Sequence, residues 1–310
     1  MTAAAPQISV VIPAYNSADY INEAIDSALA QIGVEIEVIV VDDGSSDDTV
    51  ERVKAYGDRV KLVEQVNQGS AVARNRGISE SRADFVAFLD ADDYWHPEKL
   101  AKQWALVSHG ARLVYARFSL WEEGTNGNFP AAKTHLETSQ AQGRMSKPTR
   151  DGWLYVDLLL DCEVWTSTVV AHKELLNKVG GFDPSLRKGQ DYDLWLKLAN
   201  EAEWHGVSEC LALYRIHGQN ITRSVNSNNF EYEILSNAYR RWGLQNRDGR
   251  RLPRPVMEAR LARSARSFAD AHLQAGSHAI AAQFYKISLR HQPWAPRVWL
   301  NYARARIKLN

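Results

Sequence analysis

The sequence has few cysteines and no long apolar run, and both absences narrow the class of protein. Cys162 and Cys210 are the two cysteines in 310 residues, too few for a disulfide framework or a cysteine metal cluster. Thiols this sparse suit a reducing compartment. The most apolar runs, such as Ile36–Val41 and Phe85–Leu89, fall far short of the ~20 residues of a membrane helix. Residues 1–9 lack the pattern of a signal peptide, so we expect a cytoplasmic protein.

Acidic residues are scarce near the C-terminus, although basic and acidic residues balance over the whole chain at 37 each. From Arg240 to Asn310 there are 15 basic and 3 acidic residues, a net charge of +12, so the remainder carries −12. Two interpretations stay open. The segment is either a solvated helical face or a basic tail that contacts an anionic surface, such as the inner face of a membrane.

Strand and helix patterns alternate through the first hundred residues. Apolar, β-branched runs predict strands, and apolar residues at helical spacing predict helices. The predicted strands are Ile8–Ile12, Val34–Val41, Val60–Val63 and Phe85–Leu89, and the predicted helices are Ser17–Gln31, Asp47–Tyr56, Gly69–Ser81 and Pro97–Ser108. Nearly continuous apolar strands are typical of a parallel sheet that helices cover on both faces. We therefore predict an α/β fold.

The rest of the chain divides into a polar segment, further elements and a helical tail. Residues 121–152 lack periodicity, which indicates a long loop or lid. The next predicted elements are a strand at Val164–Val170, a helix at Asp191–Ala199 and a short strand at Leu211–Tyr214. Helical patterns then dominate, so we expect an α/β domain at residues 1–224 and a basic helical extension at residues 225–310. Residues 262–289 faintly resemble one tetratricopeptide-like helix pair.

Polar turn residues follow each of the four predicted strands. They are Pro13-Ala14-Tyr15-Asn16, Asp42-Asp43-Gly44-Ser45, Asn67-Gln68-Gly69 and Asp90-Ala91-Asp92-Asp93. Open parallel sheets bind ligands beyond the carboxyl ends of their strands. All four sets of side chains should therefore gather at one edge of the sheet and form a ligand site.

Two of these turns carry carboxylates with a plausible chemical role. Asp90 and Asp92 could ligate a hard divalent cation, which would neutralise charge on a leaving diphosphate; a lone D-x-D is more often a structural turn. Asp43 could accept the imide N–H of uracil or thymine. The same turn also fits an Asx turn with a helix cap at Ser45 or Asp47, and both can hold at once.

The segment from Asn67 to Gly77 opens a predicted helix. Its backbone N–H groups, Asn67 and Arg74 could contact a nucleotide or its phosphates. For Ala73 and Gly77 we favour tight packing of the helix on the sheet.

Two further candidates lie later in the chain. Asp191 precedes a predicted helix, where it could take a proton from a hydroxyl group or simply interact with the helix dipole. His217 follows a short strand, where it could bind a metal or a phosphate; a lone histidine usually does neither.

In five linked blocks the chain resembles glycosyltransferase family 2. The blocks are Val10-Val11-Ile12-Pro13-Ala14-Tyr15-Asn16, Val40-Val41-Asp42-Asp43-Gly44-Ser45, Asn67–Gly77, Phe88-Leu89-Asp90-Ala91-Asp92-Asp93, and Gly180-Gly181-Phe182-Asp183 with Gln190-Asp191-Tyr192-Asp193-Leu194-Trp195. The resemblance extends from about residue 8 to residue 217. It implies a GT-A fold, Rossmann-like with a mostly parallel central sheet flanked by helices, a nucleotide-sugar donor, Mg²⁺ or Mn²⁺, and inversion at the anomeric carbon.

The resemblance also implies roles by position. Residues Pro13, Tyr15 and Asp43 would hold the base, and Asp90 would contact the ribose side. Asp92 would be the principal metal ligand and Asp191 the general base, while His217 would lie in the loop that closes over the donor and could serve as a second metal ligand. A single step with one carboxylate base gives inversion, because attack and departure occur on opposite faces.

The chain departs from the family pattern in two places. Gln190 stands where the family often has glutamate, which removes a charge beside Asp191. The Gln-x-x-Arg-Trp signature of processive synthases is absent, since Ala238–Trp242 lacks the glutamine. We therefore expect transfer of one sugar per encounter. The expected donor is a UDP- or dTDP-sugar. The acceptor would be a glycan, lipid-linked or protein hydroxyl in cell-surface polysaccharide or glycoconjugate synthesis, with no nucleic-acid partner and with peripheral membrane contact through the basic C-terminal helices.

Other classes of function fit the sequence less well. Neither G-x-G-x-x-G nor G-x-x-x-x-G-K-[ST] occurs, which argues against dinucleotide oxidoreductases and P-loop enzymes. A sugar-phosphate nucleotidyltransferase needs a glycine-rich, basic loop after its first strand, where this chain has Pro13-Ala14-Tyr15-Asn16. A catalytically inactive scaffold remains the non-enzymatic alternative, although Asp43, Asp92 and Asp191 are all present.

Overall fold

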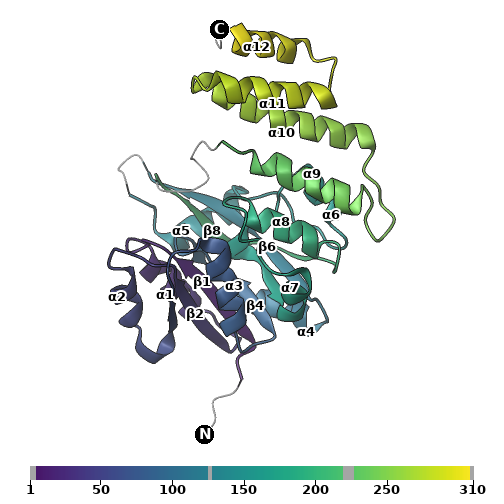
Figure 1. The fold of residues 1–310 in the computed structure, drawn as a ribbon. Helices are drawn as coiled ribbons and strands as arrows, with labels where there is room; N and C mark the ends of the chain where they lie inside the picture. The colour runs from purple at the N-terminus through teal and green to yellow at the C-terminus, as the bar shows by residue number, and fades with distance from the viewer. Residues whose placement is uncertain (1–4, 125–127, 219–226, 308–310) are drawn as a thin grey trace. The chain divides into compact units, whose positions relative to one another are not determined.

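The computed structural model describes residues 5–124, 128–218 and 227–307 (Figure 1). The chain divides into two units. The first comprises Met1–Leu154 and Cys162–Gly218 and contains a β-sheet, whereas the second comprises Tyr155–Asp161 and Gln219–Asn310 and is helical. The segment Tyr155–Asp161 thus belongs with the helical unit. The predicted division at residue 224 instead places it in the α/β domain.

The sheet of the first unit has eight strands in the order β3-β2-β1-β4-β7-β6-β8-β5. They are β1 Ile8–Ala14, β2 Ile36–Asp42, β3 Lys61–Glu64, β4 Phe85–Phe88, β5 Tyr94–Trp95, β6 Leu113–Glu122, β7 Val170–His172 and β8 His205–Ile216. Strands β1 to β4 pair in parallel. Strand β7 is antiparallel to β4 and β6, and β8 is parallel to β6 but antiparallel to β5. The mixed, mostly parallel α/β sheet confirms the predicted fold class.

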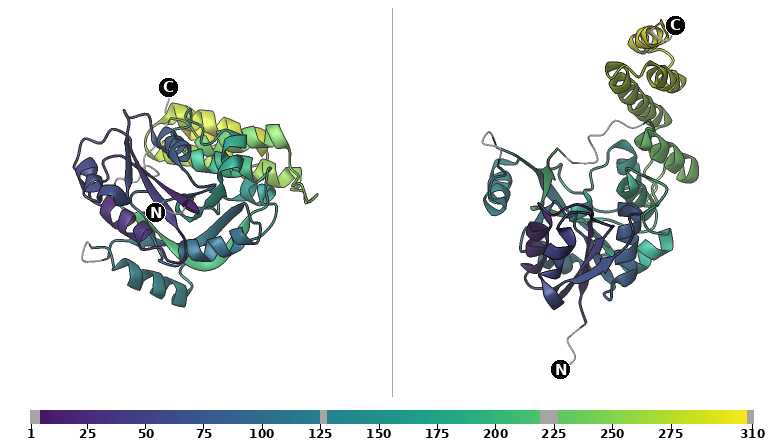
Figure 2. Two further views of the ribbon diagram at one scale, coloured as in Figure 1. Left: turned by 90° about the horizontal axis from the view of Figure 1, so that it is seen from below. Right: turned by 60° about the vertical axis from the view of Figure 1, so that its left-hand side comes forward.

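Helices cover both faces of the parallel half of the sheet (Figures 1 and 2). The helices of this unit are α1 Ile21–Leu29, α2 Thr49–Lys54, α3 Ser70–Glu80, α4 Lys99–Ser108, α5 Ala132–Gln142, α7 Lys173–Val179 and α8 Gln190–Leu198. On one face, α1 packs into a core with Val10 and Ile12 of β1. On the other face, Ala73 of α3 packs on Ile39 and Val41 of β2. Because successive strand residues point to opposite faces, the unbroken apolar strands supply both cores.

Two predictions about the middle of the chain are wrong. The predicted loop at residues 121–152 contains the helix α5, whose Ala132 and Leu136 pack with Trp121 and Leu213. The predicted strand Val164–Val170 is instead a 3₁₀ turn at Thr166–Thr168 followed by the short strand β7. Trp165 and Ser167 at this turn donate hydrogen bonds to the buried carboxylate of Asp93.

The second unit consists of α6 Tyr155–Leu160, α9 Phe230–Trp242, α10 Arg254–Gln274, α11 His278–His291 and α12 Pro296–Ile307. Helices α9 to α12 follow one another as a stack (Figure 1). Small residues let α10 and α11 approach closely, and the Tyr285 hydroxyl donates to Asp270 Oδ1 at 2.5 Å. The Tyr155 hydroxyl of α6 donates to the carbonyl oxygens of Ala238 and Gly243. Within the described ranges, every helix is too short or too polar to pass through a lipid bilayer.

Candidate active site

The loops after β1, β2 and β3 meet at one edge of the sheet. The parallel register pairs Ala14 with Asp42, and Asp42 with Glu64. The ladder continues beyond the strands, because Asp43 N donates to Ala14 O at 2.8 Å and Gln65 N donates to Asp42 O at 2.9 Å. The carboxyl ends of these strands therefore bring their polar turns together.

Asp43 organises the loop between β3 and α3. Its carboxylate is 3% exposed and accepts hydrogen bonds from Gln65 Nε2 at 2.8 Å, from Gln68 N at 2.9 Å and from Gly69 N at 2.7 Å. Gly44 lies so close to this loop that a Cβ there would sit 2.9 Å from Asn67 N, and its φ of +77° also favours glycine. Asp43 and Gly44 thus hold the loop after β2 in direct contact with the loop after β3.

Asp42, the residue before Asp43, forms the turn that follows β2. Its Oδ2 accepts from Gly44 N at 3.1 Å and Ser45 N at 3.0 Å, which is an Asx turn. Asp47 Oδ1 accepts from Thr49 N at the start of α2. The Asx turn thus exists, and it belongs to Asp42, which leaves the carboxylate of Asp43 for the neighbouring loop.

The other predicted nucleotide residues lie around this turn. Pro13 lies in β1, and Tyr15 is 52% exposed just beyond it. Asn67 is exposed in the loop before α3. Asp42 Oδ1 is buried and has no hydrogen-bond partner among the described residues. A buried acceptor in that state is the kind of atom that a ligand N–H can satisfy.

Arg74 of α3 lies at the centre of a group of carboxylates. Its Nη2 is 2.6 Å from Asp90 Oδ1, and its guanidinium is buried. Burial raises the pKa of Asp90 above its ordinary range; Arg74 opposes this effect, and the charges of Asp92 and Asp191 reinforce it. Burial acts to lower the pKa of Arg74, but the three carboxylates together raise it. The fold therefore brings Arg74, Asp90, Asp92 and Asp191 within electrostatic reach of one another.

Asp92 and His217 form a contact between the turn after β4 and the end of β8. His217 Nε2 lies 2.8 Å from Asp92 Oδ2, and the imidazole stacks on Tyr20 with ring centroids 4.6 Å apart. Asp92 retains a side-chain exposure of 27%. The two residues are 125 positions apart in the sequence, and both were expected from the family resemblance as metal ligands.

This pair fits a partial coordination site for Mg²⁺ or Mn²⁺. Within the described part of the chain, no group of three or more histidine, cysteine, aspartate or glutamate side chains is arranged to hold a metal. Magnesium commonly binds through one or two carboxylates and completes its shell with water and substrate phosphates. Asp92 therefore supplies a suitable carboxylate for an ion that arrives with a diphosphate, and His217 beside it offers an imidazole nitrogen as a second ligand.

Asp191 is the second residue of α8, which begins at Gln190 after Gly189, whose φ of +72° turns the chain into the helix. Its Oδ2 accepts from Thr166 Oγ1 at 3.1 Å. The adjacent Gln190 Oε1 accepts from Ser70 Oγ at 3.0 Å and faces Arg74 Nη1 at 3.4 Å. The amide at position 190 thus links α8 to α3 without adding a fourth negative charge to the cluster.

Asp93 is a site residue that the sequence analysis did not single out. It is fully buried, and its carboxylate accepts from Trp165 Nε1 at 2.8 Å, Ser167 Oγ at 2.5 Å and Arg215 N at 3.1 Å. Burial, together with the neighbouring Asp92 and Asp90, raises its pKa well above the ordinary range. These bonds tie the turn after β4 to the 3₁₀ turn and to β8.

Arg215 is the second such residue. Its Nε donates to Asp92 O at 2.7 Å, and its Nη2 lies 2.5 Å from Glu23 Oε2. The guanidinium lies against Trp121, 3.8 Å from the ring centroid, and Phe129, 4.7 Å away. The partners of Arg215 are far away in the sequence. Its position two residues before His217 was therefore the only sequence feature that could have indicated a role in the site.

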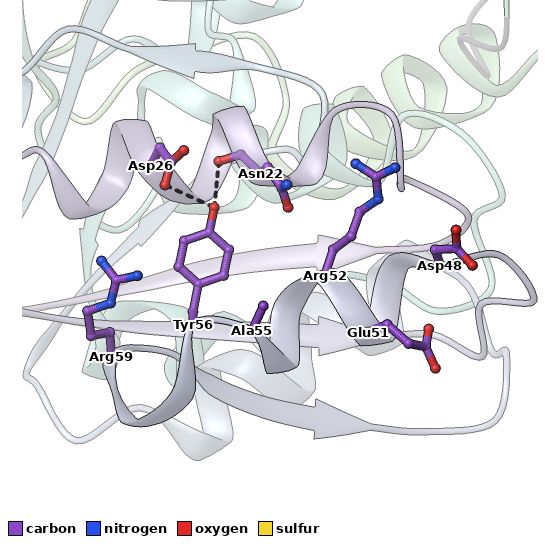
Figure 3. A pocket seen from close by; sticks show the side chains of 8 residues that line it. All are labelled: Asn22, Asp26, Asp48, Glu51, Arg52, Ala55, Tyr56 and Arg59. Atoms are coloured by element: carbon purple, nitrogen blue, oxygen red, sulfur yellow. Dashed lines mark hydrogen bonds between the residues drawn. The ribbon is translucent and has the colours of Figure 1, made fainter.

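A cavity of about 650 Å³ lies elsewhere, between α1 and α2 (Figure 3). It contains no predicted site residue. Tyr56 Oη points toward α1 and donates to Asp26 Oδ1 at 2.9 Å, and burial raises the pKa of Tyr56 to about 12. Acidic and basic side chains mix around it, including Glu51 and Arg52, so it has no clear preference for a charged ligand.

Comparison with known proteins relates the chain to one enzyme family. The model of "Glycosyl transferase family 2" matches residues 9–163. The putative teichuronic acid biosynthesis glycosyltransferase TuaG of Bacillus subtilis is 31% identical over 239 residues, which cover 74% of this chain and 86% of that protein.

Solved structures share the fold at lower identity. Staphylococcus aureus TarS 1–349 in complex with UDP-GlcNAc has a TM-score of 0.63 and 19% identity, over 97% of this chain and 88% of that one. The mannosyltransferase PcManGT of Pyrobaculum calidifontis, in complex with GDP-Man and Mn²⁺, has a TM-score of 0.58 and 19% identity, over 99% and 86%.

Proposed function

Because this chain belongs to glycosyltransferase family 2 and its sheet-containing unit has the GT-A fold, we propose that it is an inverting, metal-dependent transferase. It would move one sugar from a nucleoside-diphosphate sugar to an acceptor hydroxyl. The observation that carries the proposal is the convergence of Arg74, Asp90, Asp92 and Asp191 at the edge of the sheet where the β1, β2 and β3 turns also meet.

In this proposal, the donor base binds at the β1 and β2 turns. Pro13 and Tyr15 would contact it, and the orphan acceptor Asp42 Oδ1 beside Asp43 favours a base with an imide N–H, as in UDP or dTDP. Asn67 would contribute from the adjacent loop. The solved GT-A relatives carry UDP-GlcNAc and GDP-Man, which supports a nucleotide-sugar donor.

Asp92 and His217 would hold a Mg²⁺ or Mn²⁺ ion at the diphosphate, and Asp90 would bind the ribose side while paired with Arg74. When bound, the ion would supply stabilisation of the negative charge on the departing diphosphate. The presence of Mn²⁺ in the mannosyltransferase relative supports a divalent ion.

Asp191 would act as the general base. The Thr166 hydroxyl orients one of its oxygens, and the other faces toward the helix backbone, where Tyr192 N donates at 2.8 Å. A carboxylate held in this way can take the proton of the acceptor hydroxyl as that oxygen attacks the sugar carbon. With one base and no second carboxylate acting as nucleophile, the product has the inverted configuration.

The acceptor is proposed to be a glycan, lipid-linked or protein hydroxyl in cell-surface polysaccharide or glycoconjugate synthesis. The similarity to TuaG, a putative teichuronic acid biosynthesis glycosyltransferase, supports this class. The lack of the processive signature supports the addition of one sugar at a time. The cytoplasmic location predicted from the sparse cysteines stays a prediction.

Substitution of the proposed base tests the proposal. Asp191→Asn keeps the shape of the side chain and should bind a nucleotide-sugar in the presence of Mn²⁺ as tightly as wild type, while turnover falls by about 10²–10⁴-fold. Calorimetric titration measures binding, and release of nucleoside diphosphate from a panel of UDP-, dTDP- and GDP-sugars measures turnover. Lost donor affinity would assign Asp191 to donor binding, and a wild-type protein inert toward the whole panel would contradict the proposal.

A further inference from the structure

The last helix of the second unit presents an apolar face to solvent. Val298 and Ala305 of α12 are buried in the core of the unit. Trp299, Leu300 and Ile307 on the same helix are 51%, 53% and 73% exposed, and Trp294 just before it is 94% exposed. We call these four residues, Trp294, Trp299, Leu300 and Ile307, the α12 surface.

The exposed residues form a stripe rather than a scatter. At about 100° per residue, Trp299, Leu300 and Ile307 fall on one side of α12, away from the buried residues Val298 and Ala305. Elsewhere in the described chain, large exposed apolar side chains occur singly, such as Ile32 and Val66. An apolar stripe that none of the described elements covers marks a surface for interaction.

Positive charge borders this stripe. The helical positions of Arg306 on one side, and of Arg297 and Arg304 on the other, flank the apolar residues, and all three side chains are exposed. From Ala271 to Asn310 the sequence contains six lysines and arginines and no aspartate or glutamate. A partner for this surface must therefore be apolar at its centre and negatively charged around it.

An anionic lipid bilayer meets both conditions. Interfacial helices carry tryptophan and leucine on the face that enters the headgroup region and basic residues beside it. A second copy of the chain would fit poorly, because a two-fold interface would place Arg297, Arg304 and Arg306 against the same three residues. We propose that α12 docks the protein on an anionic membrane surface, with the α12 surface inserted among the lipid headgroups.

Co-sedimentation of the full chain with vesicles tests this. Wild type should bind vesicles of phosphatidylcholine with phosphatidylglycerol and not vesicles of phosphatidylcholine alone, and salt should weaken binding. Trp294→Ala with Trp299→Ala should reduce partitioning at least tenfold. The single variants Arg297→Gln, Arg304→Gln and Arg306→Gln should each reduce partitioning roughly fivefold. Ile32→Ala, an exposed apolar residue of the other unit, is the matched control and should bind like wild type.

Two readouts keep the result interpretable. Circular dichroism melts should show that the tryptophan variants stay folded, and their release of nucleoside diphosphate from donor should equal that of wild type, because the assay needs no vesicle. Vesicle binding needs no nucleotide-sugar, so its failure leaves the proposed transfer reaction untouched. Equal binding to both vesicle types, or unchanged binding of the tryptophan variant, overturns the proposal. So does a wild-type dimer that the tryptophan variant loses while neither binds vesicles.

Discussion

At the residue scale, the proposed site concentrates more negative charge than its own cation balances. Asp90, Asp92 and Asp191 all interact electrostatically with Arg74, and the neutral side chain of Gln190 also contacts that arginine. Like charges at short range are unfavourable. A divalent ion at Asp92 and His217 would reduce that repulsion, so donor and ion are expected to bind with mutual support.

Removal of the proposed metal ligand should therefore abolish transfer. Asp92→Ala deletes the carboxylate that would carry the ion to the diphosphate, and loss of one group that stabilises developing charge commonly costs about 10²–10³-fold in rate. Measured turnover should no longer respond to added Mn²⁺. Asp58→Ala serves as the control, because this exposed carboxylate precedes β3 and so lies at the opposite end of that strand from the site. Near-normal turnover in Asp92→Ala would remove Asp92 from the mechanism.

Arg215 should act as a positioning residue. Arg215→Lys keeps the charge that faces Glu23 but loses the Nε bond to Asp92 O. A hydrogen bond from a charged donor contributes about 1.5–3 kcal/mol, so kcat should fall roughly 10–100-fold while the Mn²⁺ concentration for half-maximal activity rises.

Steady-state kinetics across a Mn²⁺ series checks the role of Arg215. Arg112→Lys is the matched control, because Arg112 pairs with Glu174, whose side chain is 74% exposed, and should leave activity unchanged. If Arg215→Lys lowers thermal stability but leaves kcat and the Mn²⁺ dependence intact, the residue is structural only.

The sequence could predict some of these residues and not others. Asp43, Asp90 and Asp92 stand at strand ends, and that position alone predicts where they lie. Asp93 and Arg215 act through partners such as Trp165 that come from distant strands and turns. No local pattern encodes such pairings, so they emerge only from the folded chain.

At the element scale, α3 packs on β1 through a glycine. A Cβ at Gly77 would lie 2.2 Å from Val11 Cγ1, well inside van der Waals contact. The sequence favours packing over ligand binding as the role of this glycine, and the geometry is that of a packing contact. Helix α5 shows the opposite case: its apolar contacts rest on Ala132 and Leu136 alone, too few to produce a visible period in a polar segment.

Gly77→Ala should destabilise the protein, against the helix propensity trend. Alanine in place of glycine inside a helix normally stabilises by about 1 kcal/mol. Here the clash with Val11 should cost about 1–3 kcal/mol, so the net free energy of unfolding should fall. Denaturant titration measures it. In a Val11→Ala background the same Gly77→Ala change should cost less, because the clashing methyl groups are gone. A stabilised Gly77→Ala protein would show that α3 moves away at little cost.

At the scale of the whole molecule, the second unit combines an apolar core with charged links between its helices. His291 Nδ1 lies 2.6 Å from Glu258 Oε2, and Arg260 Nη2 lies 2.5 Å from Glu231 Oε1. The hydrogen bond with His291 lowers the pKa of Glu258 below its ordinary value of 4.5. Burial acts to raise the pKa of Glu231, but Arg260, the Ser264 hydroxyl and Arg263 together outweigh it and the pKa is lowered.

Acid should therefore loosen the helical unit. A depressed carboxyl pKa contributes stability that is complete above the unfolded value and is lost as the pH falls through the folded value. Thermal unfolding followed by helical circular dichroism should show a lower midpoint below about pH 4.5 than at about pH 7. Glu231→Gln with Glu258→Gln should melt earlier at neutral pH and respond less to acid. An equal response to acid in wild type and variant would mean that other groups set the acid stability.

Ligand binding should stabilise the other unit and so separate the two transitions. All residues proposed to hold the donor and the ion lie in the sheet-containing unit, so a ligand at about 100 times its Kd adds about 2.7 kcal/mol to that unit alone. For a unit of roughly 200 residues this raises the melting midpoint by about 5–10 °C. Scanning calorimetry with the preferred nucleotide-sugar and Mn²⁺ should shift one transition upward, and chelation of Mn²⁺ should reverse the shift while the acid-sensitive transition stays in place. A donor that moves both transitions equally, or one that stabilises without any divalent ion, would contradict the metal-dependent site and the independence of the two units.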